Sequence, residues 1–229
     1  MKEKFHKPLW PYSKRQVKPT FKQFTESVYH LNYYLNLLNE FHLTLDEVLA
    51  SKDASQTYRT VCRISIQWVT ILIFCSVEDE ISKFLYAYKG GSSELQNRIK
   101  EFKKMTKPIW DEIKEWEHIR IFRNHALAHN LRDNRKGFES VFNGKQLNEY
   151  DIPNSFKELL VFIKGLQILL MLATEVFAPE LEEAKIALNK EARPSSRRPN
   201  EQMIESWNNA ITEANKAIMR YNNNKKDTA

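Results

Sequence analysis

Apolar residues recur three and four positions apart along most of this chain, a spacing that gives an α-helix one apolar face. Turn residues are scarce, with 5 glycines and 8 prolines in 229 residues, which favours long helices over a many-stranded sheet. We therefore predict an all-α fold, a mostly up-and-down helical bundle. The predicted helices cover Thr20–Leu43, Thr44–Ala50, Ala54–Lys89, Ser93–Met105, Thr106–Leu131, Ser155–Phe177, Pro179–Ala192 and Glu201–Tyr221.

Breakers and capping residues set the ends of these helices. Gly90-Gly91 ends the helix 54–89, and Pro108 is acceptable in the first turn of the helix 106–131. The predicted N-caps are Thr44, Ser92 or Ser93, and Asn154 or Ser155. Between the helices, the polar segment 132–152 has room for one short hairpin, with Phe138–Phe142 as a strand.

The two most apolar runs, Trp68–Val77 and Leu159–Ala178, are expected to be core helices of a soluble, cytoplasmic protein with no membrane partner. The first run is too short to span a bilayer, and the second contains Lys164, Gln167 and Glu175. The N-terminal residues lack the apolar core of a secretory signal, which also favours the cytoplasm.

Charge separates a basic N-terminal arm from a body that is close to neutral. The net charge is +6, and residues 1–22 hold seven basic side chains against one acidic side chain. The expected organisation is the arm at 1–19, the bundle at 20–192, a linker at 193–200, an amphipathic helix at 201–221 and a loose tail at 222–229.

The basic arm has two interpretations. Lys14, Arg15 and Lys18, with aromatic residues interleaved, can hold an RNA backbone and stack its bases. The alternative, which is commoner for a single basic arm, is a solvated tail whose aromatic residues fold back onto the domain.

The residues that bear most directly on chemistry lie in the segment 123–130, Arg-Asn-His-Ala-Leu-Ala-His-Asn. Arg123 precedes the amide Asn124, and His129 follows six residues after the arginine. A guanidinium stays charged and can hold two phosphate oxygens, while an imidazole exchanges a proton near neutral pH. Since RNA carries its own nucleophile, the ribose 2′-hydroxyl, two such groups are enough to cleave it without a metal.

An arginine, a polar residue and then a histidine four to six positions after the arginine, on a late helix of a bundle, resembles the HEPN superfamily. The sequence RNHALAHN resembles the variant found in abortive-infection HEPN proteins. The resemblance is specific over 123–130 and extends to the architecture of roughly 20–190. It implies a HEPN-like fold and a metal-independent endoribonuclease without cofactors, acting on RNA as a homodimer with a composite active site. It also implies a place in antiviral defence or a toxin–antitoxin system, with an antitoxin or an activator protein as a further partner.

In this interpretation His129 is the general acid and base, Arg123 is the phosphate clamp, and Asn124 positions the phosphate or the histidine. The alternative is a non-catalytic HEPN-like helical module that binds RNA or a protein partner. In that case Arg123 pairs with a buried acid, and His129 packs or caps a helix. We favour the enzyme.

The helical wheel of the predicted helix 106–131 places Arg120 and Arg123 on an apolar stripe, where an arginine needs a partner or a polar cleft. The side chains of Arg123 and His129 stand about 120° apart on a straight helix. To act on one phosphate they need a bend in the helix, the long reach of arginine, or contributions from two subunits.

Two further groups of residues are candidates for supporting roles. Asp79 and Glu80, in a run of three acids, can pair with Arg123 or orient His129; alternatively, the run marks where a buried helix re-enters water. His125 lines the same cleft as His129 or faces solvent. The two histidines are four residues apart, but no Cys-x-x-Cys or His-Glu-x-x-His completes a zinc site, so we expect no metal.

Overall fold

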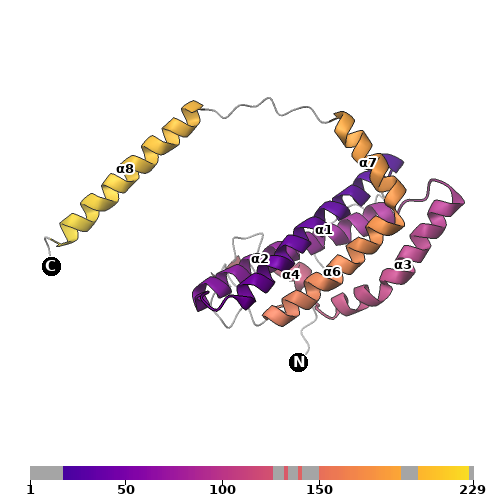
Figure 1. The fold of residues 1–229 in the computed structure, drawn as a ribbon, viewed down its shortest axis with the longest axis horizontal. Coiled ribbons are helices and arrows are strands. Elements are labelled where there is room, and N and C mark those ends of the chain that lie inside the picture. The colour runs from indigo at the N-terminus through magenta and orange to yellow at the C-terminus, as the bar shows by residue number, and fades with distance from the viewer. Residues whose placement is uncertain (1–17, 126–131, 134–138, 141–149, 192–200, 227–229) are drawn as a thin grey trace. The chain divides into compact units, whose positions relative to one another are not determined.

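The computed structural model describes residues 18–125, 132–133, 139–140, 150–191 and 201–226 (Figure 1). Side chains are described for 18–124, 150–190, 201–202 and 205–216. The chain forms an all-α helical bundle, which confirms the predicted fold class. It divides into two compact units, residues 1–187 and 188–229.

The helices of the described residues are long, and the strands are short. In chain order the helical elements are α1 (Phe21–Ala50), α2 (Gln56–Glu80), the π-helix η1 (Ile81–Leu85), α3 (Ser93–Lys114), α4 (Ile119–His125), α6 (Phe156–Val176), α7 (Ala178–Glu191) and α8 (Glu201–Lys226). Between α4 and α6, β1 (Arg132–Asp133) pairs antiparallel with β2 (Glu139–Ser140), so a short hairpin lies in the segment where the sequence predicted one.

The first helix is one continuous element, and the predicted helix boundary at Thr44 is wrong. The Thr44 hydroxyl donates to the carbonyl of Glu40 at 2.8 Å, inside the helix. A threonine that bonds back to the preceding turn needs no capping role. The true cap is Thr20, whose hydroxyl accepts from the backbone N–H of Gln23 at 3.2 Å while the Gln23 side chain accepts from the Thr20 N–H at 2.9 Å.

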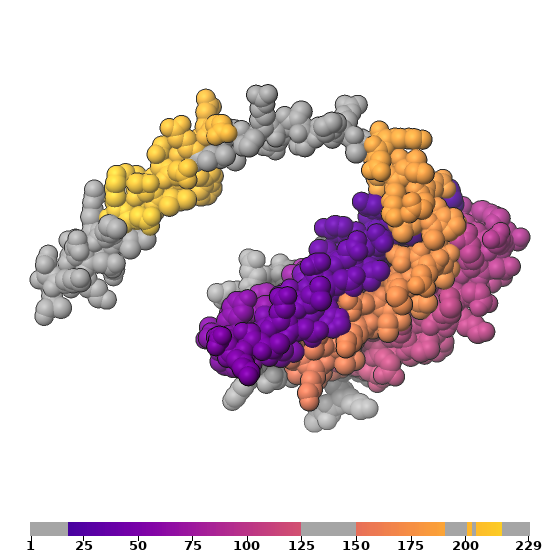
Figure 2. All heavy atoms as spheres, viewed as in Figure 1, coloured from indigo at the N-terminus to yellow at the C-terminus, as the bar shows by residue number. Residues whose placement is uncertain are grey.

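The core lies where α1 and α6 run side by side in opposite directions, with α3 on the far side of α6 (Figures 1 and 2). The ring of Phe24, near the start of α1, contacts Phe177 at the end of α6 with centroids 5.4 Å apart. Farther along, the Gln167 amide of α6 donates to the Asn39 Oδ1 atom at 2.7 Å. The largest fully buried side chains include Phe24, Phe102, Phe122, Phe162 and Phe177. Burial of this apolar surface is the main source of stability in the bundle.

Two segments, 56–85 and 156–176, are long and apolar enough to cross a membrane, with mean hydropathies of 1.7 and 1.9. Within the fold, 44% and 39% of the 18-residue apolar window in each segment is buried. Core helices of soluble proteins have the same length and composition, so the cytoplasmic location stays a prediction.

The predicted helix 106–131 is wrong at its start. Pro108 lies inside α3, which begins at Ser93 and is capped by Ser92, whose hydroxyl accepts from the backbone N–H of Leu95 at 3.2 Å. A proline inside a helix forfeits one hydrogen bond, a cost that tertiary packing can outweigh. Here the buried Phe102 and Ile113, on either side of the proline, hold the helix against the core.

The helix that carries the arginine motif is instead the short α4, which starts at Ile119. A distant residue, Asp151, fixes this start. The backbone N–H of Asp151 donates to His118 Nδ1 at 2.8 Å, and its carboxylate accepts from the backbone N–H of Glu117 at 3.2 Å. The turn at 115–118 is therefore stabilised by a segment more than thirty residues away, which explains why the local pattern did not predict it.

Candidate functional site

The short helix α4 presents its arginines to the surface. Ile119 and Phe122, three residues apart, are 2% and 0% exposed, and the Phe122 ring packs on Tyr150 with centroids 5.0 Å apart. Because these two residues fix the inward face, Arg123 and the neighbouring Asn124 lie on the exposed side. The expected placement of the arginines on one long apolar stripe is wrong, since the break at 115–118 separates α4 from the stripe of α3.

The first arginine of α4, Arg120, is held by two acids from the end of α2. Its Nε atom donates to Glu78 Oε2 at 2.5 Å, and a terminal nitrogen donates to Asp79 Oδ1 at 3.0 Å. Asp79 also pairs with Lys83 at 2.9 Å. This network ties α4 to the α2–η1 junction and neutralises the charge of Arg120.

The third acid of the run turns toward α1. Glu80 Oε1 lies 3.0 Å from His30 Nδ1, and the backbone carbonyl of Glu80 accepts from the Ser27 hydroxyl at 3.2 Å. Asp79 and Glu80 were both predicted as candidate partners of Arg123. Among the described residues their partners are instead Arg120, Lys83 and His30.

The second arginine, Arg123, is exposed and has a different environment. One of its terminal nitrogens donates to the Oδ1 atom of Asn124 at 2.9 Å, so the amide orients the guanidinium. Within the described part of the chain, no carboxylate pairs with Arg123. Among the described residues, carboxylates compensate the positive charge of Arg120 but not that of Arg123.

Both arginines lie near the buried thiol of Cys75. Burial raises the pKa of Cys75 to about 11, although the positive charges of Arg120 and Arg123 oppose this shift. The thiol is thus protonated at neutral pH and acts as a small core side chain.

Several predicted site residues fall outside what the structure describes. His129, Lys14 and Arg15 lie outside the described residues, and His125 is described as the last residue of α4 without its side chain. Lys18 is described and exposed. The three ways in which Arg123 and His129 could act on one phosphate therefore stay open: a bend in the helix, the long reach of arginine, or a second subunit.

A cavity of about 330 Å³ beside this site is a feature that the sequence interpretation missed. It lies between the α2–η1 segment and α3, and Glu78, the partner of Arg120, is one of its lining residues. Lys103 and Lys107, one helical turn apart in α3, line it together with Trp110, but the sequence alone gives no sign of the facing α2–η1 wall. Elsewhere among the described residues, no group of three or more histidines, cysteines or acids stands close enough to hold a metal ion.

The acid cluster gives the protein a pH-dependent contribution to stability. Burial would raise the pKa of Asp79, but hydrogen bonds and charge from Lys83 and Arg120 outweigh it and hold the pKa below the ordinary value of 3.8. A carboxylate with a depressed pKa in the folded state stabilises the fold above its unfolded-state pKa, and this contribution is lost as the pH falls through the lower folded value. We expect Asp79→Asn to reduce the free energy of unfolding at pH 7 by about 1 kcal/mol or less, because the pair is partly exposed.

Urea unfolding at pH 7 and near pH 3 measures this contribution. The difference in free energy of unfolding between the native protein and Asp79→Asn should be smaller at the lower pH. Asp53→Asn, at an exposed position, is the matched control and should show little difference at either pH. A difference for Asp79→Asn that is equal at both pH values would contradict the ionic origin of the effect.

Comparison of the whole chain with protein-family models, with curated proteins and with solved structures finds no match. The resemblance to the HEPN superfamily therefore depends on the sequence of the segment 123–130 alone. The activity that the resemblance implies is a proposal, argued next from the geometry of Arg123.

Proposed function

We propose that this protein is a metal-independent endoribonuclease of the HEPN type. The observation that carries the proposal is the contrast between two arginines on one short helix. Arg120 is neutralised by Glu78 and Asp79, while Arg123 is exposed, oriented by Asn124 and without a carboxylate partner in the described part of the chain. An oriented and uncompensated guanidinium is suited to hold a phosphate that gains negative charge.

The reaction follows from the chemistry of RNA. The ribose 2′-oxygen attacks the adjacent phosphorus and forms a 2′,3′-cyclic phosphate, and the bond from phosphorus to the 5′-oxygen breaks. In the proposed mechanism His129 removes the 2′-hydroxyl proton as general base and returns it to the departing 5′-oxygen as general acid, and Arg123 holds the non-bridging oxygens. Asn124 keeps the guanidinium in place through its 2.9 Å hydrogen bond.

The proposed setting is the cytoplasm, in antiviral defence or as the toxin of a toxin–antitoxin system, with an antitoxin or activator protein as a partner. The proposed assembly is a homodimer with a composite site. In such a dimer the second subunit can supply one of the two catalytic groups, which is one of the three ways in which Arg123 and His129 can act on the same phosphate.

The second candidate is a non-catalytic HEPN-like module that binds RNA or a protein. The lysines of α3 and the adjoining cavity support the RNA-binding form of this alternative, because neither depends on His129. The two candidates differ in whether a phosphodiester bond is broken.

Cleavage of a mixed-sequence single-stranded RNA in EDTA tests the proposal. We expect the native protein to leave 2′,3′-cyclic phosphate ends, and we expect His129→Ala and Arg123→Ala to lose this activity. An all-DNA strand of the same sequence should resist, because it lacks the 2′-hydroxyl.

Matched controls separate the loss of chemistry from the loss of fold. His42→Ala removes an imidazole of α1 outside the proposed site, and Lys164→Ala removes an exposed cation of α6; both should cleave like the native protein. If the pure native protein leaves the RNA intact while all variants fold normally, the non-catalytic module is the correct assignment. Cleavage of DNA at a comparable rate would exclude the proposed mechanism.

A further inference from the structure

The cavity beside α4 has an aromatic wall. Trp110 of α3 is partly buried and packs on Phe74 with ring centroids 6.2 Å apart. Tyr86, just after η1, is also partly buried, and its hydroxyl shares a 3.1 Å hydrogen bond with the Thr106 hydroxyl. Burial raises the pKa of Tyr86, although the approach of Thr106 and the Trp110 indole opposes this. The ring face of an indole at a cavity wall is a platform on which a flat ligand can stack.

Polar groups accompany this platform. The Trp110 indole N–H is buried beside the Tyr86 hydroxyl, and the hydrogen bond between them opposes the rise that burial causes in the pKa of Tyr86. Ser82 of η1 adds an exposed hydroxyl at the same cavity, and π-helical turns such as η1 recur at functional sites.

The cavity also carries excess positive charge. Lys103, Lys107 and Lys114 line it together with two acids. One acid, Glu78, is neutralised by Arg120, and the other, Asp111, pairs closely with Lys107 and lies 3.8 Å from Lys114. Lys103 lies over the Tyr86 ring with its Nζ atom 5.3 Å from the centroid. Lys107 and Lys114 share the single carboxylate of Asp111, and Lys103 has no carboxylate partner among the described residues, so the cavity carries net positive charge beside the aromatic wall.

Glu78 connects the cavity to the short helix α4. Glu78 lines the cavity and binds Arg120, and Arg123 lies one helical turn farther along α4. An RNA strand with one phosphate bound at Arg123 has a further nucleotide on each side of that phosphate. The neighbouring hollow with stacking and cationic groups is placed to receive its next residue.

We propose that this cavity binds one nucleotide of a single-stranded RNA, with the base on Trp110 and the phosphate near Lys103 and Lys114. A base offers a π-face to the indole ring and acceptor atoms to the exposed Ser82 hydroxyl, which an acyl chain does not. The volume of about 330 Å³ lies at the lower end of ligand pockets, which suits one nucleotide and not a duplex. The choice of RNA as the ligand rests on the proposed function.

Binding of a labelled 2′-O-methyl RNA strand tests the proposal without cleavage, because the methyl group blocks the nucleophile. Fluorescence anisotropy in EDTA should show that Trp110→Leu raises the Kd by about 5- to 150-fold, the range for one stacked base. Trp110→Phe keeps an aromatic face and should recover most of the affinity. Because Trp110 also contacts the core, both variants are compared with the native protein by circular dichroism.

A double variant at exposed residues tests the charge independently of folding. Lys103→Gln with Lys114→Gln should weaken binding and reduce the slope of log Kd against log salt by about 0.7, the value for one phosphate that is no longer neutralised. The matched control is Lys52→Gln with Lys164→Gln, two exposed lysines away from the cavity, which should bind like the native protein.

The outcomes distinguish this proposal from the proposed catalysis. If Trp110→Leu and the Lys103/Lys114 double variant both bind the RNA strand as tightly as the native protein does, the cavity proposal is overturned, even if the native protein cleaves RNA. Selective weakening in these variants supports it, even if the native protein cleaves nothing. Free 5′-AMP binding as tightly as the strand would reassign the cavity to a mononucleotide and overturn the strand proposal.

Discussion

Arg123→Ala is expected to slow RNA cleavage by about 10²- to 10³-fold, the usual effect of removing one preorganised donor from a developing oxyanion. The free energy of unfolding should stay within about 0.5 kcal/mol of the native value, because Arg123 is an exposed residue. Its bond to the adjacent Asn124 crosses no packing interface. Arg123→Ala should therefore lose activity without losing stability, as expected for a side chain that acts in function and not in folding.

The conservative variant Arg123→Lys refines the test. Lysine keeps the charge but loses the planar fork that holds two phosphate oxygens, so we expect an intermediate rate. Initial rates of cleavage in EDTA, with Lys164→Ala as the exposed-cation control, measure the effect. An Arg123→Ala protein that cleaves at the native rate would remove Arg123 from the proposed site, and an equal loss in Lys164→Ala would indicate a general effect of charge.

Local patterns predicted most of the helices because their determinants are local. Ser92 and Ser155 cap α3 and α6 through hydrogen bonds to residues three positions ahead, and such caps are legible in sequence. The prediction of one helix over 106–131 is wrong because Asp151, which lies more than thirty residues away in sequence, bonds to Glu117 and His118 and stabilises the turn between α3 and α4.

The sequence predicted which residues belong to the candidate site, but it did not predict which arginine pairs with which acid. The spacing of Arg120 and Arg123 on one helix is local, whereas the choice of Arg120 as the partner of Glu78 and Asp79 depends on how α4 lies against α2. The cavity was missed for a related reason. Trp110 resembles a core residue in sequence, and only packing against the α2–η1 segment leaves its ring at a hollow lined by lysines.

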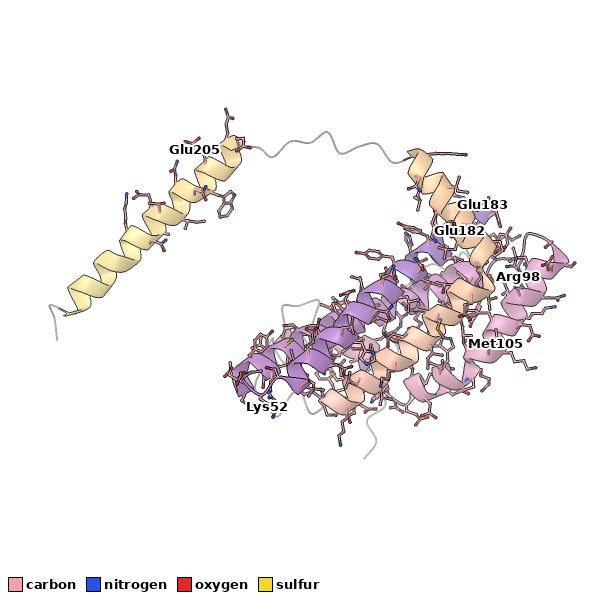
Figure 3. The ribbon with its side chains drawn as sticks, in the orientation of Figure 1. Lys52, Arg98, Met105, Glu182, Glu183 and Glu205 are labelled. Atoms are coloured by element: carbon pink, nitrogen blue, oxygen red, sulfur yellow. The ribbon has the colours of Figure 1, made fainter. Side chains whose placement is uncertain are left out.

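The strongest charged contact among the described residues ties α3 to the start of α7, away from the candidate site. The terminal nitrogens of Arg98 donate to the two carboxylate oxygens of Glu180 at 2.8 and 2.6 Å, and one of them also donates to the Val176 carbonyl at 2.8 Å. Figure 3 shows Arg98 near the N-terminal end of α3, beside α7. Glu180 is only 6% exposed, and its hydrogen bonds raise the pKa of Arg98. This pair joins three helices at one point.

Arg98→Ala is expected to reduce the free energy of unfolding by about 3 to 5 kcal/mol, because it leaves the Glu180 carboxylate buried without a partner. Urea or thermal unfolding at pH 7 measures the loss. The matched control is Lys185→Ala, which breaks an exposed pair with Glu182 on α7 and should cost about 1 kcal/mol or less. Equal losses in the two variants would show that Arg98–Glu180 behaves as a surface pair.

A double variant separates the two possible origins of the loss. Arg98→Met with Glu180→Leu removes both charges and keeps apolar volume, and such replacements of buried ion pairs are often neutral or stabilising. We expect the double variant to recover most of the stability lost in Arg98→Ala. Recovery would mean that the stranded charge, and not the missing hydrogen bonds, causes the loss. A double variant as unstable as Arg98→Ala would instead assign the effect to the hydrogen bonds that Arg98 makes to Glu180 and to the end of α6.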